Sequence, residues 1–174
     1  EFGLDVQVTG RKAPTTINAA FNPEQFWDGR EGNVFRDPVT GSVVLGDNAS
    51  LESQAKNPPT GANEMSHVGR DWTDVANRVA ASEPLALAPF VPPPLDNWIN
   101  NRSYAQLFTQ VFGDPAITPA RILMAIGTYE RTLISDQTPF DRNQLTPSQQ
   151  WGLDLFTSKA RCNLCHEAPL FRDD

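Results

Sequence analysis

The five residues Cys162–His166 constrain this chain more than any other feature of its sequence. They read Cys-Asn-Leu-Cys-His, so two thiols stand three positions apart and an imidazole follows at once. In a C-x-x-C-H pattern each sulfur can bond to one vinyl group of a haem, and the adjacent His can bind the iron. The sequence therefore predicts a covalent c-type haem held by Cys162 and Cys165, with His166 as the iron ligand.

Three other interpretations of these residues stay open. A thioredoxin-like redox pair would need a βαβ setting, whereas the residues before Cys162 have a helical pattern. A structural zinc ion would need four nitrogen or sulfur ligands, and the chain supplies only Cys162, Cys165, His166 and the distant His67. A simple disulfide would leave His166 without a role. Haem attachment uses both thiols and the adjacent imidazole and needs no ligand from elsewhere in the chain.

Composition narrows the class of protein. The 174 residues are enough for one domain, or for one domain and a piece of another. A formal net charge of −7 disfavours nucleic acid as a partner, because its phosphates would be repelled. No apolar run approaches the ~18 residues that a membrane-spanning helix needs. Fifteen Pro and eleven Gly predict helices joined by long irregular segments.

Hydrophobic periodicity and capping residues predict an all-α chain. Each expected helix follows a capping residue or carries an apolar stripe at helical spacing. Thr118 and Thr146, each followed by proline, give the two strongest starts. The expected helices are 50–56 with Ser50 as its cap, 72–81, 103–112, 118–133 and one from Thr146 that leads to the haem motif.

The remaining segments are expected to be irregular. Residues 13–30 predict an ordered loop whose aromatic side chains pack inward. Residues 31–50 predict a surface excursion with a brief strand at Val43–Leu45. Pro84–Pro94 predicts an extended, proline-rich spacer.

Several segments, taken in order, resemble one family. They are Ala13–Thr15 with Asn18–Ala19, Phe26–Arg30, Glu64–Met65, Tyr129–Leu133, Pro139–Arg142, Gly152–Phe156 and Cys162–His166. Together they resemble the di-haem cytochrome c peroxidase and methylamine-utilisation (MauG-type) family, and the resemblance covers nearly all of the chain. Members of that family have two all-helical cytochrome c domains, each with its own C-x-x-C-H.

The resemblance implies a domain organisation. Cys162–His166 corresponds to the second, electron-relay haem. Residues 1–143 are then the remainder of the N-terminal, peroxidatic domain, with an insertion loop at 31–50 and a proline-rich arm at 84–94. Residues 144–174 are the start of the second domain. The first haem motif is expected upstream of Glu1, so we interpret the chain as an interior portion of a di-haem protein.

The resemblance also assigns catalytic roles. Glu64 matches the acid over the peroxidatic iron, which takes a proton from the near oxygen of hydrogen peroxide and returns it to the leaving oxygen. Trp27 matches the tryptophan between the two haems. Without the resemblance, Glu64 would read as an ordinary surface residue and Trp27 as a core aromatic.

Four further residues have weaker assignments. Arg30 is a candidate partner for a haem propionate, with a solvated turn arginine as the alternative. Met65 is expected to pack beside a haem rather than to bind iron. His67 has no motif support and reads as a surface histidine. Lys12 stands where the family has an Asn ligand of calcium, and an ammonium group cannot bind the ion, so calcium is not assumed.

The function implied by the resemblance is periplasmic peroxide reduction. Electrons would come from a small donor protein, a cytochrome c or a cupredoxin, and a homodimer is also allowed. One alternative is oxidation of an organic or protein substrate, as in MauG-type or rubber-oxygenase members. Residues 4–7 favour it, since they contain no His where reductively activated peroxidases carry a blocking one, and so does the long spacing from Arg30 to Glu64. The non-enzyme alternative is an electron-transfer cytochrome.

Overall fold

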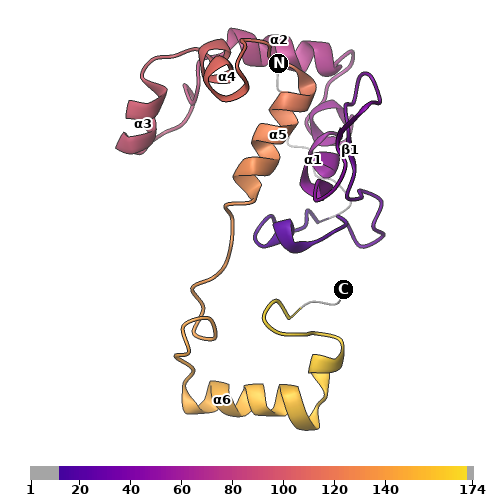
Figure 1. The fold of residues 1–174 in the computed structure, drawn as a ribbon, viewed down its shortest axis with the longest axis vertical. Coiled ribbons are helices and arrows are strands. Elements are labelled where there is room, and N and C mark those ends of the chain that lie inside the picture. Colours follow the sequence, from indigo (N-terminus) through magenta and orange to yellow (C-terminus); the bar gives the residue numbers. More distant parts are fainter. Residues whose placement is uncertain (1–11, 172–174) are drawn as a thin grey trace. The chain divides into compact units, whose positions relative to one another are not determined.

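The computed structural model describes residues 12–171, so residues 4–7 of the missing-His argument lie outside it. The chain folds into two compact units, Glu1–Ile134 and Ser135–Asp174 (Figure 1). Within the described part, no helix is both long and apolar enough to cross a bilayer. The helices there are α1 (Ser50–Ala55), α2 (Trp72–Ala81), α3 (Pro93–Ile99), α4 (Tyr104–Phe112), α5 (Pro119–Glu130) and α6 (Pro147–Asp154).

Helices dominate, as predicted, but the first unit also contains a small sheet. Strands β1 (Phe35–Arg36) and β2 (Val43–Leu45) pair antiparallel, with Phe35 opposite Leu45. The predicted strand at 43–45 is therefore confirmed, while the strict all-α expectation is wrong at this hairpin. Short 3-10 turns lie at Ala19–Phe21, Pro58–Thr60 and Cys162–Leu164, and a π-helical turn at Leu155–Lys159.

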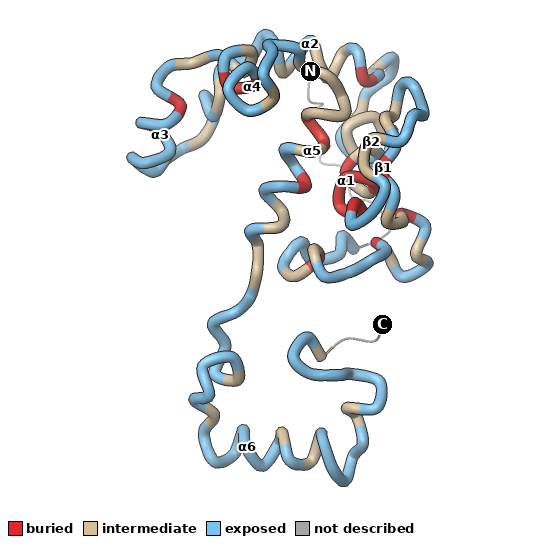
Figure 2. The backbone as a smooth tube through the Cα atoms, in the orientation of Figure 1, coloured by how far each residue is buried: buried red, intermediate tan, exposed pale blue. Residues whose placement is uncertain are grey.

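The core of the first unit forms where α1, α5 and the hairpin meet, and Figure 2 shows buried backbone concentrated on α1 and parts of α5. Phe35 and Leu123 are fully buried, and each side chain contributes about 1.5–3 kcal/mol by leaving water. Ala49, Ala55 and Trp72 complete the cluster. Since Phe35 and Ala49 lie within 31–50, the expected surface excursion is wrong for these residues. Whether 31–50 is an insertion stays a prediction.

A partly buried ion pair joins α1 to the end of α5. Arg131 donates to both carboxylate oxygens of Glu52 at 2.5 and 2.8 Å, and the Glu52 side chain is only 3% exposed. Gly127 on α5 makes room for this pair, because a Cβ there would lie 2.5 Å from Glu52 Oε1. Burial, followed by the charge of Glu52, raises the pKa of Glu130. The close packing of α1 against α5 thus depends on Gly127 and on the two hydrogen bonds from Arg131 to Glu52.

Helix starts follow the capping residues closely. Ser103 and Thr146 form capping boxes with Gln106 and Gln149, and Thr118 accepts from the Arg121 amide. These side chains satisfy amides that the first helical turn leaves without partners. The predicted starts of α4, α5 and α6 are confirmed.

Other details of the predicted helices are wrong. Ser50 does not cap α1; Ala49 occupies that position, and Ser50 Oγ donates instead to the Asn22 carbonyl at 2.7 Å. Helix α3 begins at Pro93, inside the predicted spacer, because proline is well suited to a first helical turn. Val111 of α4 and Tyr129 of α5 are 63% and 65% exposed, so these two side chains of the expected helices lie outside the core.

Candidate functional site

The haem motif is a single tight turn that follows α6. The Cys162 carbonyl accepts hydrogen bonds from the amides of Cys165 and His166, at 3.2 and 2.9 Å. This closes the backbone so that both sulfurs and the imidazole emerge from five consecutive residues. Both thiols are free, so the disulfide that one interpretation predicts does not form here.

Two aromatic side chains lie near the motif within the second unit. The Phe156 ring centroid lies 6.5 Å from that of His166, and Phe171 makes an edge contact with Phe156 at 5.6 Å. Helix α6 buries none of its residues, and Figure 2 shows most of it exposed. Trp151 and Leu164 are 66% and 70% exposed. Two free thiols, an adjacent imidazole and bare apolar surface fit a covalently attached macrocycle.

A direct metal site is a separate question from haem attachment. Across residues 12–171, no three or more His, Cys, Asp or Glu side chains are arranged to hold a metal ion. The donors in the motif are the two thiols and one imidazole, which is the set that c-type haem attachment uses.

Glu64 lies on a hydrogen-bonded loop, residues 57–67, that we call the Glu64 loop. The Pro58 carbonyl accepts from the amides of Gly61 and Met65, at 3.3 and 3.2 Å. The Gly61 carbonyl accepts from the amides of Glu64 and Ser66, at 3.0 and 3.1 Å. Glu64 and Met65 are both exposed. The loop therefore presents an accessible carboxylate on an ordered backbone.

Gly61 is a functional candidate that the sequence analysis missed. A Cβ at this position would lie 2.9 Å from Glu64 Oε2 and 3.2 Å from the Asn57 carbonyl oxygen. The Glu64 carboxylate therefore occupies space that only glycine leaves open. The sequence feature that could have identified Gly61 is its place three residues before Glu64, shortly after Pro58 and Pro59.

Trp27 stands on an exposed turn of the first unit. Its side chain is 89% exposed, so the core-aromatic interpretation and the expected inward packing are both wrong for Trp27. Arg30 pairs with Asp28 at 2.9 Å, and its guanidinium lies 3.7 Å from the Phe26 ring centroid. Arg30 is thus engaged within its own turn, and its role toward a propionate stays a prediction.

Buried polar contacts connect the turn that carries Trp27, residues 25–31, to the Glu64 loop. Gln25 is buried and donates to Ser50 Oγ at 3.0 Å, which anchors the turn on α1. Glu31, at the other end of the turn, accepts from Asn57 Nδ2 at 2.6 Å and pairs with Lys56 at 3.0 Å. Because Asn57 begins the Glu64 loop, the two segments that carry the predicted catalytic residues adjoin one carboxylate.

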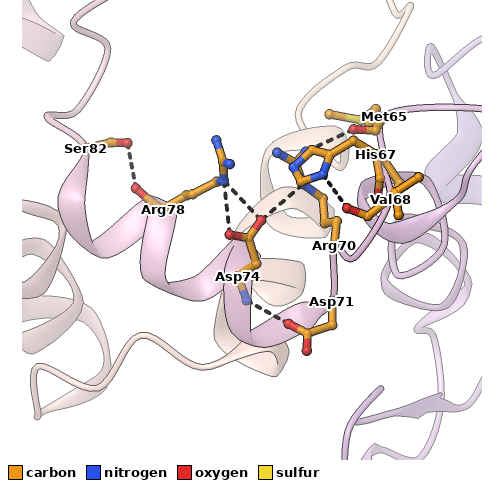
Figure 3. Close-up of polar contacts among 9 residues, drawn as sticks. Met65, His67, Val68, Arg70, Asp71, Asp74, Arg78 and Ser82 are labelled. Carbon is orange, nitrogen blue, oxygen red and sulfur yellow. Dashed lines mark hydrogen bonds and ion pairs between the residues drawn. The ribbon is translucent and has the colours of Figure 1, made fainter. Parts of the chain in front are cut away.

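A second anchor of the Glu64 loop comes from its other side (Figure 3). Arg70 donates to the Met65 carbonyl at 2.9 Å and pairs with Asp74 of α2 at 3.3 Å. His67 is exposed, and its Nδ1 lies 3.0 Å from the Val68 carbonyl oxygen. Sequence reasoning did not single out Arg70.

The predicted site residues divide between the two units. Glu64, Met65, Trp27 and Arg30 belong to the first, whereas the residues of the haem motif belong to the second.

Comparisons with known proteins agree with the family resemblance of the sequence. The family model of the di-haem cytochrome c peroxidases matches residues 1–149. The methylamine utilization protein MauG of Methylophilus methylotrophus is 30% identical over 172 residues, which is 94% of this chain and 40% of that protein. The cytochrome c peroxidase Ccp of Escherichia coli K12 is 29% identical over 160 residues, covering 88% of this chain and 26% of that protein.

A third relative gives the same result. The cytochrome c551 peroxidase of Nitrosomonas europaea is 28% identical over 163 residues, 90% of this chain and 37% of its own. The chain thus spans 26% to 40% of the length of these three relatives. On the match over residues 1–149, the chain belongs to the di-haem cytochrome c peroxidase family.

Proposed function

We propose that this chain forms part of a peroxidase that reduces hydrogen peroxide to water. Cys162, Cys165 and His166 would hold the haem that relays electrons, and Glu64 would act over a second haem held by a motif outside this sequence. The observation that carries the proposal is the turn of two free thiols followed at once by an imidazole. Family membership supports the same assignment.

Glu64 would move one proton between the two oxygens of peroxide. A bound haem would supply the iron where peroxide binds and the electrons for its reduction. The carboxylate of Glu64 accepts the proton from the near oxygen and donates it to the leaving oxygen, which departs as water rather than hydroxide. Two electrons and two protons then turn one peroxide into two waters. The exposure of Glu64 leaves its carboxylate accessible for this role.

Trp27 and Met65 would act at the haem surfaces. An indole that is 89% exposed can lie against another surface and shorten the path of an electron toward the peroxide site. Met65, 60% exposed and adjacent to Glu64, would pack beside the macrocycle. Arg30 would pair with a propionate if it exchanged its bond to Asp28.

The setting follows from the same proposal. Residues 1–143 would complete a cytochrome c-like peroxidatic domain, and residues 144–174 would begin the second. Attachment of c-type haem outside the bacterial cytoplasm would place the protein in the periplasm. A donor such as a small cytochrome c or cupredoxin would meet a chain with a net charge of −7, so a basic docking patch on that donor is expected. Assembly as a homodimer and the absence of calcium stay predictions.

A second candidate function keeps the scaffold but oxidises an organic or protein substrate. The relatives named MauG, at 30% and 32% identity, favour it. Steady-state assay with peroxide and a reduced cytochrome separates the two candidates. Rapid peroxide consumption supports the first, whereas slow consumption with oxidation of another substrate supports the second.

Substitution of Glu64 tests the proton-transfer role. In the haem-loaded protein, Glu64→Gln keeps the shape of the side chain and removes the basic oxygen, so we expect kcat for peroxide to fall about 100-fold or more. The measurement is steady-state peroxide reduction with a reduced donor, and Glu83→Gln, on an exposed turn, is the control. Unchanged turnover in Glu64→Gln would overturn the proposed role.

A further inference from the structure

We propose that Arg70 is a positioning residue that holds the Glu64 loop against helix α2. The catalytic part of this inference rests on the proposed role of Glu64. The structural part, that Arg70 fixes the loop, stands on its own contacts.

The contacts place Arg70 between the loop and the helix (Figure 3). Its Nη1 donates to the Met65 carbonyl at 2.9 Å, and its Nε donates to Asp74 Oδ2 at 3.3 Å. The Arg70 side chain is only 14% exposed, so its position is fixed by the surrounding protein, while the Met65 carbonyl that it binds lies at an exposed position. One guanidinium therefore spans the carbonyl next to Glu64 and a carboxylate on α2.

The helical end of this bridge is itself well held. Arg78 Nε donates to both oxygens of Asp74, at 3.3 and 3.0 Å, and the Asp71 side chain caps the Asp74 amide at 2.8 Å. Burial acts to raise the pKa of Asp74, but the hydrogen bonds and charges of Arg78 and Arg70 outweigh it and lower that pKa. Asp74 is thus an ionised acceptor on a helix anchored by Trp72, which is 7% exposed.

The loop end of the bridge lies next to the proposed proton carrier. Met65 is fixed at both backbone groups: its amide donates to the Pro58 carbonyl at 3.2 Å, and its carbonyl accepts from Arg70. The residue that follows Glu64 is therefore held through both of its backbone groups. Displacement of a reacting group by 1 Å can cost about 100-fold in rate, so such anchoring matters for a carboxylate that shuttles a proton.

Arginine suits this position better than lysine would. The planar guanidinium offers several donors in a fixed fork, so it can serve two acceptors at once. An ammonium on a flexible stem would keep the charge but would hold the carbonyl and the carboxylate less rigidly.

The test compares Arg70→Ala with Arg78→Ala in the haem-loaded protein. Both substitutions remove one partner of Asp74, but only the first removes the bond to Met65. Hydrogen exchange measures the order of the loop directly. In Arg70→Ala we expect the amides of Met65 and Ser66 to exchange about tenfold faster, while Arg78→Ala leaves them unchanged.

Peroxide kinetics measure the catalytic consequence. We expect kcat to fall about 10- to 100-fold in Arg70→Ala with little change in KM, and Arg70→Lys to recover part of it. Arg78→Ala should retain normal turnover. If Arg70→Ala does not fold, Arg70→Lys is compared with Arg78→Ala in the same two measurements.

The outcomes separate this inference from the proposed function. Unchanged exchange at Met65 and Ser66 would overturn the positioning role, whatever the rates are. Faster exchange with normal kcat, in a protein where Glu64→Gln is inactive, would overturn the link to catalysis alone. Normal turnover in Glu64→Gln would overturn the proposed function, and faster exchange in Arg70→Ala would then still support the structural role.

Discussion

Glu64 owes its side-chain position to the missing Cβ of Gly61. Gly61 has an ordinary φ of −76°, so Gly61→Ala adds no strain in φ, but the new Cβ would lie 2.9 Å from Glu64 Oε2 and 3.2 Å from the Asn57 carbonyl oxygen. The flexible carboxylate must therefore move. We expect kcat/KM for peroxide to fall about tenfold while the thermal midpoint hardly changes, as measured by steady-state kinetics and calorimetry.

Gly46→Ala is the matched control, because a Cβ there meets no atom within 4 Å. Equal kinetics for the two alanine variants would contradict the role assigned to Gly61.

A single residue could be predicted from the sequence where a local sequence pattern identifies it. Cys162, Cys165 and His166 could be predicted because their chemistry requires fixed spacing. Gly61 and Arg70 could not be predicted. Gly61 matters because the Glu64 carboxylate lies close to it, and Arg70 matters because its side chain bonds to the Met65 carbonyl, and both contacts depend on the folded structure. Trp27 was assigned correctly to a turn-rich loop, but its exposure depends on packing that no spacing reveals.

At the scale of elements, the pairing of α1 with α5 depends on Arg131. Arg131→Ala leaves the Glu52 carboxylate, which is 3% exposed, without its ion-pair partner. We therefore expect the free energy of unfolding to fall by about 3 kcal/mol, which is near the lower end for the loss of one partner of a buried ion pair. Urea unfolding of the two proteins measures the difference.

Arg36→Ala provides the comparison, because Arg36 is exposed and its side chain donates to the Gly41 carbonyl at 3.3 Å, a long bond at the surface. A loss in Arg131→Ala no larger than in Arg36→Ala would show that the Glu52 pair does not stabilise the fold.

A second ion pair, between Asp114 after α4 and Arg121 of α5, makes the stability of the fold depend on pH. The hydrogen bond from Arg121 is the largest cause that lowers the pKa of Asp114 from 3.8 to about 2. A lowered carboxyl pKa stabilises the fold above pH 3.8, and this contribution is lost as the pH falls toward 2. Asp114→Asn should therefore lower the urea midpoint slightly at pH 7, and the difference should shrink between pH 3.8 and pH 2. A difference that does not vary with pH would contradict this linkage.

Helices were predictable where short-range chemistry decides them. The caps Ser103, Thr118 and Thr146 act through bonds to amides three residues on, so sequence alone locates α4, α5 and α6. Helix α3 was missed because four prolines near its start favour both an extended arm and a first helical turn. The burial of Phe35 was missed because Asn33, Arg36 and Asp37 stand close to it in the sequence, and only tertiary packing reveals it.

At the scale of the whole molecule, the two units differ in how they are stabilised. The first has a continuous core around Phe35 and Leu123, formed by the chain itself. The second has aromatic contacts around Phe156, while α6 buries no residue. The proposed covalently bound macrocycle would cover apolar side chains of this unit such as Trp151 and Leu164, which are 66% and 70% exposed.

Peptide mapping of the protein matured with its haem is the most direct test of the central claim. We predict that the peptide carrying Cys162 and Cys165 has gained the mass of one haem through two thioether bonds, and that Cys162→Ala with Cys165→Ala abolishes this gain. Recovery of the same peptide with free thiols, or with a disulfide between them, would contradict the account.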